Sequence, residues 1–156
     1  MYQHILVPVD GSATSNAGLD EAIKIAKALG SQLRLLHVVD QMPLAMSAEG
    51  FGTGSFDLLG MLKEAGARIL ADAKGRALAA GVAADTMLID GPGSRLSEHV
   101  VTVARQWPAD LVVIGTHGRR GIGRVLLGSD AEQVVRQAPV PVLLYRAGEP
   151  ASSAAG

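Results

Sequence analysis

Glycines that follow a strongly apolar segment give this chain its clearest candidate for phosphate chemistry. The stretch from Asp110 to Asp130 contains Gly115, Gly118 and Gly128, separated by two and nine residues, and Ser129 follows directly. Glycines let a backbone approach an anion closely, and the first N–H groups of a helix have no partner inside that helix. A strand, a glycine-rich loop and a helix start therefore predict a site for phosphate groups.

Three arginines crowd the same loop, at Arg119, Arg120 and Arg124. They form either a solvated charge cluster or a set of ligands for a polyphosphate, because the planar guanidinium group binds phosphate oxygens in pairs. We expect Arg119 or Arg124 to contact phosphate and do not choose between them. His117 lies in this loop, and we expect it to contact phosphate as well.

The end of the loop predicts how the next helix begins. Ser129 has Glu132 three residues later, a spacing that is typical of a capping box at a helix start. A capping hydroxyl also lies beside the position of a phosphate, so the two roles of Ser129 are compatible. Glu132 is more readily explained by the cap than by a role as a water-activating base.

Asp10 is the second chemical candidate, because it follows another apolar segment and precedes Gly11 and Ser12. An aspartate at such a position closes a turn, caps a helix or binds the hydroxyl groups of a ligand. The glycine loop favours the ligand role, and we expect Asp10 to contribute to the same site.

Several enzyme signatures are missing from the sequence. It has no Gly-x-x-x-x-Gly-Lys-Ser/Thr loop and no Gly-x-Ser-x-Gly elbow, and its four histidines lack metal-ligand spacing. No obvious nucleophile is accompanied by an orienting base. We therefore name no catalytic residue and assign no protein ligands to a metal.

Composition narrows the class of protein. Aromatic residues make up 3% of the 156 residues and the net charge is −1, which disfavours a nucleic-acid surface. The chain has no cysteine, no apolar run long enough to span a membrane and no signal-peptide pattern. We expect a cytoplasmic protein that binds neither nucleic acid nor membrane.

Apolar periodicity supplies the elements that must position these residues. The patterns predict an alternation of strands and helices, which favours a parallel α/β sheet with helices on both faces. The ligand of such a sheet binds beyond the carboxyl ends of the strands, where the strand order reverses. The expected strands are His4 to Val9, Gln32 to Val39, Thr86 to Ile89, Leu111 to Ile114 and Val140 to Tyr145. The expected helices start near Ser15, Leu58, Ser94 and Ser129.

The remaining segments complete one expected domain over residues 1–146. Residues 40–56 form a long glycine-containing loop whose conformation the sequence does not determine. Residues 147–156 are small and polar, and we expect them to be a disordered tail.

Four segments together make the chain resemble the universal stress protein family. They are the opening His4 to Ser12, the pair His37-Val38-Val39, the run Ala109 to Gly118, and the closing Pro139 to Leu143. The resemblance extends from Met1 to about Arg146. The spacing of Gly115, Gly118, Gly128 and Ser129 is similar to the motif of the nucleotide-binding branch of that family.

This resemblance implies a Rossmann-like open sheet of five parallel strands in the order 3-2-1-4-5, which brings Asp10 next to Gly115. It also implies ATP as ligand, commonly with Mg²⁺. Asp10 would then contact the ribose, Pro8 and Val39 would lie near the adenine, and the glycine loop would hold the phosphates. The full candidate set is Pro8, Val9, Asp10, Val39, Ile114, Gly115, His117, Gly118, Arg119, Arg124, Gly128, Ser129 and Asp130.

The last strand is expected at an edge of the sheet, where unpaired backbone groups invite a partner strand. In the family this strand mediates dimers, so the resemblance implies a homodimer through Val140 to Tyr145. Three functions stay open: a regulatory protein that binds ATP with slow or no hydrolysis, an ATPase or nucleotide phosphotransferase using the same site, and a dimeric interaction module. We favour the ATP-binding regulator, whose downstream partner the sequence does not identify.

Overall fold

A parallel sheet of five strands forms the centre of the computed structural model, which describes residues 1–41, 57–91, 95–116 and 127–146. The strand order is β3-β2-β1-β4-β5, so the expected order 3-2-1-4-5 is confirmed. The strands are β1 (His4–Pro8), β2 (Gln32–Val38), β3 (Ala84–Ile89), β4 (Leu111–Thr116) and β5 (Val142–Arg146). The helices between them are α1 (Ala13–Leu29), α3 (Leu58–Ala79), α4 (Leu96–Gln106) and α5 (Ser129–Gln137).

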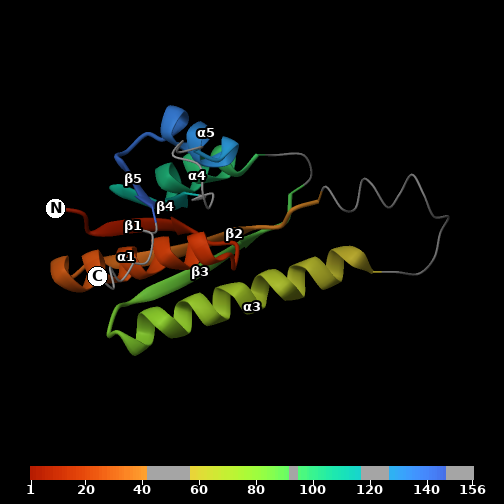
Figure 1. The fold of residues 1–156 in the computed structure, drawn as a ribbon, viewed down its shortest axis with the longest axis horizontal. Coiled ribbons are helices and arrows are strands. Elements are labelled where there is room, and N and C mark those ends of the chain that lie inside the picture. The colour runs from red at the N-terminus through yellow and green to blue at the C-terminus, as the bar shows by residue number, and fades with distance from the viewer. Residues whose placement is uncertain (42–56, 92–94, 117–126, 147–156) are drawn as a thin grey trace, which may run out of the picture.

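Two apolar cores, one on each face of the sheet, show that the helices cover both faces as expected. On one face α1 and α3 pack on residues such as Ile5, Leu35 and Val113. On the other face α4 and α5 pack on the alternate residues, among them Leu6 and Val112. Because successive side chains of a strand point to opposite faces, a strand that is buried on both sides must be apolar throughout. Figure 1 shows the two helix pairs on opposite sides of the strands.

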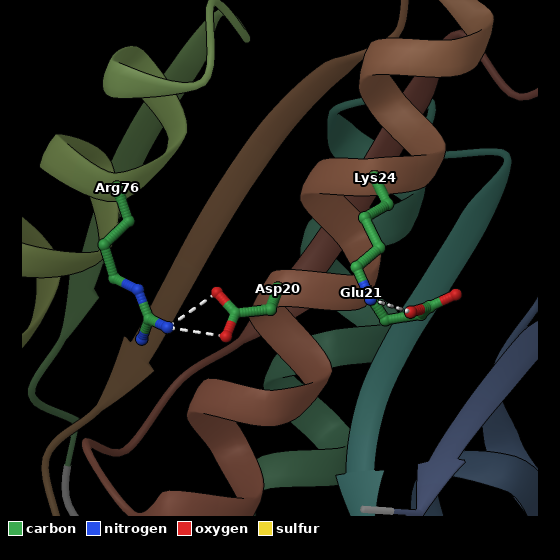
Figure 2. Close-up of polar contacts among 4 residues, drawn as sticks. All are labelled: Asp20, Glu21, Lys24 and Arg76. Carbon is green, nitrogen blue, oxygen red and sulfur yellow. Dashed lines mark hydrogen bonds and ion pairs between the residues drawn. The ribbon is translucent and has the colours of Figure 1, made fainter.

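The helices α1 and α3 lie next to each other on one face and are bridged by an ion pair. Figure 2 shows Arg76 of α3 reaching Asp20 of α1, with an N···O distance of 2.6 Å. The same view shows a second pair, Lys24 with Glu21 at 3.2 Å, which lies within α1 and joins no other element. Only the first pair therefore ties the two helices together.

All five strands differ from their expected limits by one or two residues, and the differences in β4 and β5 have a clear physical reason. β4 continues two residues beyond Ile114, because Gly115 and Thr116 pair with β5. β5 begins at Val142 instead of Val140. Pro141 lacks the N–H that a strand residue would donate, although its carbonyl accepts the N–H of Val112 at 3.0 Å.

The predicted capping box at the start of α5 is wrong. Gly128 occupies the cap position, Ser129 is the first helical residue, and no side chain of the described residues caps this helix. Glu132 instead pairs with Arg136 one turn later, at 2.8 Å. Val135 of this helix is 43% exposed. The helix buries Ala131 and Val134, so its buried face is narrow.

The preceding helix was expected to start near Ser94, and α4 begins at Leu96 with Arg95 at its cap position. Ser94, most of the 40–56 loop and the tail 147–156 lie outside the described residues. Within the described part of the chain, no helix is long and apolar enough to cross a membrane.

Candidate functional site

A cleft of about 1250 Å³ lies at the carboxyl edge of the sheet. It opens where the chain leaves β1 for α1 on one side and leaves β4 on the other. These two strands are neighbours in the sheet, yet their connections lead to opposite faces. This is the switch point at which parallel α/β sheets bind ligands.

Nine of the thirteen predicted site residues line this cleft, and they come from both ends of the sequence. They are Pro8, Val9, Asp10, Val39, Ile114, Gly115, Gly128, Ser129 and Asp130. The other four, His117, Gly118, Arg119 and Arg124, lie outside the described residues. The fold therefore brings Asp10 and the two ends of the glycine loop to one cavity.

Asp10 is held by the turn that connects β1 to α1. Its Oδ1 accepts the N–H of Ser12 at 2.8 Å, and its own N–H donates to the Ser15 hydroxyl at 3.0 Å. The side chain is exposed, and its Oδ2 makes no hydrogen bond with any residue that the structure describes. A carboxylate oxygen on a rigid turn is thus available to hydroxyl groups of a ligand.

The turn also explains how α1 begins, and it decides between the roles considered for Asp10. Ser12 caps the helix, since its Oγ accepts the N–H of Ser15 at 3.2 Å. Asp10 closes the turn before the cap and does not cap the helix itself. This structural role leaves its second oxygen in the cleft, so turn and ligand roles are compatible.

Gly115 is required by the packing of α1 and not by a turn. It is a strand residue of β4, and it is not among the described glycines with positive φ, which are Gly11, Gly30 and Gly81. A Cβ at Gly115 would lie 2.1 Å from the carbonyl oxygen of Thr14, well inside any possible contact. The glycine therefore lets the first turn of α1 pack closely against the end of β4, where Thr14, Ser15 and Gly115 form part of the cleft floor.

His37 is a cleft residue whose place in the site the sequence did not predict, although it was expected near a strand. Its Nδ1 lies 2.8 Å from the carbonyl oxygen of Val9, the residue before Asp10. That geometry means that Nδ1 carries the proton and donates it to the carbonyl. The ring also packs against α3, where a Cβ on Gly66 would lie 2.6 Å from Cδ2 of the imidazole. His37 thus links β2, the end of β1 and α3.

The other cleft residues that sequence analysis missed come mainly from α3 and from helix starts. The signal that could have identified the helix starts is their place after strands, where ligands of such sheets bind. The α3 residues gave no local signal, because only tertiary packing lays this helix over the cleft. The missed residues include Ser12, Thr14, Ser15, Gln41, Leu62, Ala65, Gly66, Ile69, Arg95 and Leu96.

An ion pair fastens α3 at the rim of this cleft. Lys63 Nζ lies 2.6 Å from Asp90 Oδ2, just after β3, and Gln41 Nε2 donates to the Asp90 carbonyl at 2.7 Å. The hydrogen bond from Lys63, with its positive charge, lowers the pKa of Asp90 below the ordinary 3.8. The same contact raises the pKa of Lys63 above 10.5. Both side chains are nearly half exposed, so the pair holds position more than it adds stability.

The charges of the described lining residues are mainly negative. Asp10, Asp40 and Asp130 contribute three negative charges and Arg95 one positive charge, which leaves −2. No three acidic, histidine or cysteine side chains of the described residues group together in a way that would hold a metal ion. Mg²⁺ commonly binds one or two carboxylates together with substrate phosphates, so single carboxylates here fit a cation that a nucleotide brings with it.

Comparison with known proteins gives consistent matches over almost the entire chain. The model of the universal stress protein family matches residues 1–146. Universal stress protein MJ0531 of Methanocaldococcus jannaschii is 36% identical over 148 residues, covering 94% of this chain and 83% of that protein.

Solved structures agree with the sequence matches. A crystal structure of a protein from the same family from Burkholderia pseudomallei superposes with a TM-score of 0.72 at 33% identity, covering 94% of this chain and 97% of that one. A universal stress protein crystallised in complex with cAMP superposes with a TM-score of 0.66 at 28% identity, covering 92% and 98%.

Proposed function

The chain belongs to the universal stress protein family, and on this premise we propose that its cleft binds an adenine nucleotide, ATP with Mg²⁺ foremost, as a regulatory ligand. The observation that carries the proposal is the meeting of Asp10 with Gly115, Gly128 and Ser129 in one cleft at the switch point. A carboxylate suits ribose hydroxyls, and a helix start without a side-chain cap suits phosphate. The relative bound to cAMP supports an adenine nucleotide as the class of ligand.

The proposed arrangement divides the ligand among the elements of the cleft. The apolar ends of β1 and β2, Pro8, Val9 and Val39, would contact the base, and Asp10 would contact the ribose. Ile114, Gly115 and the α5 start from Gly128 to Asp130 would lie along the phosphates. His117, Gly118 and Arg119 or Arg124 would complete the phosphate site from outside the described residues.

Slow or absent hydrolysis is part of the proposal, because three of the described hydroxyl and imidazole groups of the cleft already have structural contacts. Ser12 caps α1, and the Ser15 hydroxyl accepts the N–H of Asp10. His37 donates a hydrogen bond to the Val9 carbonyl. None of these three contacts places a base beside a nucleophile or a water molecule. An ATPase or phosphotransferase is the alternative, and steady turnover of ATP would favour it.

Equilibrium titration of the full chain with ATP and Mg²⁺ tests the proposal, and we expect one adenine-selective site. Asp10→Ala should weaken binding about tenfold, the typical value of one hydrogen bond to a charged group. Asp72→Ala is the matched control, because Asp72 is an exposed carboxylate on α3 that does not line the cleft. Absence of binding, or an equal loss in both variants, would overturn the proposal.

Two further properties belong to the same proposal. We propose a homodimer through β5, an edge strand that has β4 on one side and no described strand on the other. The cytoplasmic location expected from the sequence stays a prediction.

A further inference from the structure

We propose that Arg95, at the start of α4, contacts the phosphates of the bound nucleotide and makes the site select by phosphate number. The inference rests on the proposed function, since it concerns the same cleft. It adds a phosphate contact on α4, which lies outside the glycine loop in which the sequence predicted such contacts.

Arg95 has the position and the freedom for this role. It lines the cleft, its side chain is exposed, and it precedes the first residue of α4. Its carbonyl accepts the N–H of Glu98 at 3.1 Å, so the backbone starts the helix while the side chain caps nothing. The guanidinium group makes no ion pair with any of the described residues, which leaves it available to a ligand.

The neighbouring helix brings the phosphate position within reach of this side chain. Helices α4 and α5 pack against each other on the same face of the sheet, as Figure 1 shows. Both run back from the carboxyl edge, so their first residues meet at the cleft, where Arg95 and Ser129 are both lining residues. Packed helices lie about 8–10 Å apart, a gap that an extended arginine side chain and a bound phosphate can fill together.

The charge of the described lining residues favours a cation such as Arg95 beside a polyphosphate. Asp10, Asp40 and Asp130 outnumber Arg95, the only lysine or arginine among the described lining residues. Like charges repel each other, and each added phosphate increases the repulsion from these carboxylates. The guanidinium group of Arg95, extended towards the start of α5, would offset this repulsion and bind two phosphate oxygens at once.

Titration of Arg95→Ala with ATP, AMP and adenosine tests the proposal by comparing three ligands that differ only in phosphate number. We expect the affinity for ATP to fall about tenfold or more, the affinity for AMP to fall less, and that for adenosine to stay unchanged. Arg105→Ala is the matched control, because Arg105 is exposed in the last turn of the same helix, away from the cleft. Its affinities should equal those of the unaltered protein.

The outcomes separate this inference from the proposed function. If the unaltered protein binds no adenine nucleotide, both proposals fail. If it binds ATP and Arg95→Ala binds ATP equally well, the nucleotide site stands and the role of Arg95 is overturned. An equal loss for ATP, AMP and adenosine also overturns it, since Arg95 would then contact the nucleoside. Thermal unfolding of each variant shows whether the fold is intact.

Discussion

At the scale of single residues, glycines determine how closely the elements of the site approach each other. Gly115 of β4 faces the Thr14 carbonyl of α1, and Gly18 of α1 faces the Gly115 backbone, where a Cβ would lie 2.8 Å from its nitrogen. The two glycines therefore meet across one contact between helix and strand. The cleft floor depends on that contact, because the residues on either side of it line the cavity.

Replacing Gly115 with alanine should lower the free energy of unfolding by about 1–3 kcal/mol, the usual cost of overpacking. The added methyl group would meet a backbone carbonyl, which cannot rotate away as a side chain can. Urea denaturation followed by circular dichroism measures the change.

Gly75→Ala provides the control for Gly115→Ala. Gly75 lies within α3, and a Cβ at this position would have no neighbour within 4 Å. Alanine there should raise stability by roughly 0.5–1 kcal/mol, because it restricts the unfolded chain and favours the helix. The close approach of α1 to β4 would be contradicted if both substitutions stabilised the protein.

At the scale of elements, α3 is a wall of the cleft that specific contacts hold in place. Gly66 lets the helix pack closely against His37, which lines the cleft, and the Lys63–Asp90 ion pair holds the helix at the cleft rim. Arg76 ties its far half to Asp20 of α1. Because its four lining residues Leu62, Ala65, Gly66 and Ile69 include no charged group, this wall suits a base more than a phosphate.

The Lys63–Asp90 pair predicts a defined pH dependence. The pKa of Asp90 is lower in the folded protein than its ordinary 3.8, so the pair stabilises the fold above that value. The stabilisation is lost as pH falls below 3.8 through the lowered pKa. The raised pKa of Lys63 acts at the other end, where stabilisation is present below 10.5 and lost as pH rises further.

Carboxyl chemical shifts of Asp90 measured by NMR over acidic pH test this pair directly. In Lys63→Met the titration of Asp90 should move up towards 3.8. Lys24→Met, which removes the partner of Glu21 within α1, should leave Asp90 unchanged. The assignment fails if Asp90 titrates alike in all three proteins.

At the scale of the whole molecule, the sheet has two edges, β3 and β5, and they differ in their cover. α3 packs against β3, whereas β5 is contacted by α1 and α5 and still leaves Leu144 39% exposed. A second copy of β5 would pair with the open backbone groups and cover Leu144. This is the physical basis of the proposed homodimer.

Leu144→Lys should convert the proposed dimer into a monomer, because it places a charge on the surface that the partner strand would cover. Light scattering after size-exclusion chromatography gives the mass in solution. Leu78→Lys is the control, since Leu78 is a leucine of α3 that is 54% exposed and belongs to no strand. Equal masses for both variants, or a monomeric unaltered protein, would contradict the dimer through β5.

The sequence by itself determined the alternation of strands and helices and the segments that follow each strand. Both depend on local patterns, namely apolar runs, helical periodicity and turn residues, so Asp10, Val39 and Gly128 were placed near the ends of their elements without a structure. The order of the strands followed from resemblance and not from these patterns. The start of α5 shows the limit of such local patterns. The sequence predicted Ser129 as the capping residue, whereas Gly128 occupies the cap position, and the same local sequence is compatible with both arrangements.

Only the tertiary structure decided which distant residues share the cleft. His37 and Gly66 meet because α3 crosses β2, and Gly115 is a glycine because α1 presses on β4. Arg95 reaches the same cavity because α4 packs beside α5. Each of these contacts joins segments that lie far apart in the chain. How closely the segments approach depends on tertiary packing, which the local periodicity of the sequence does not specify.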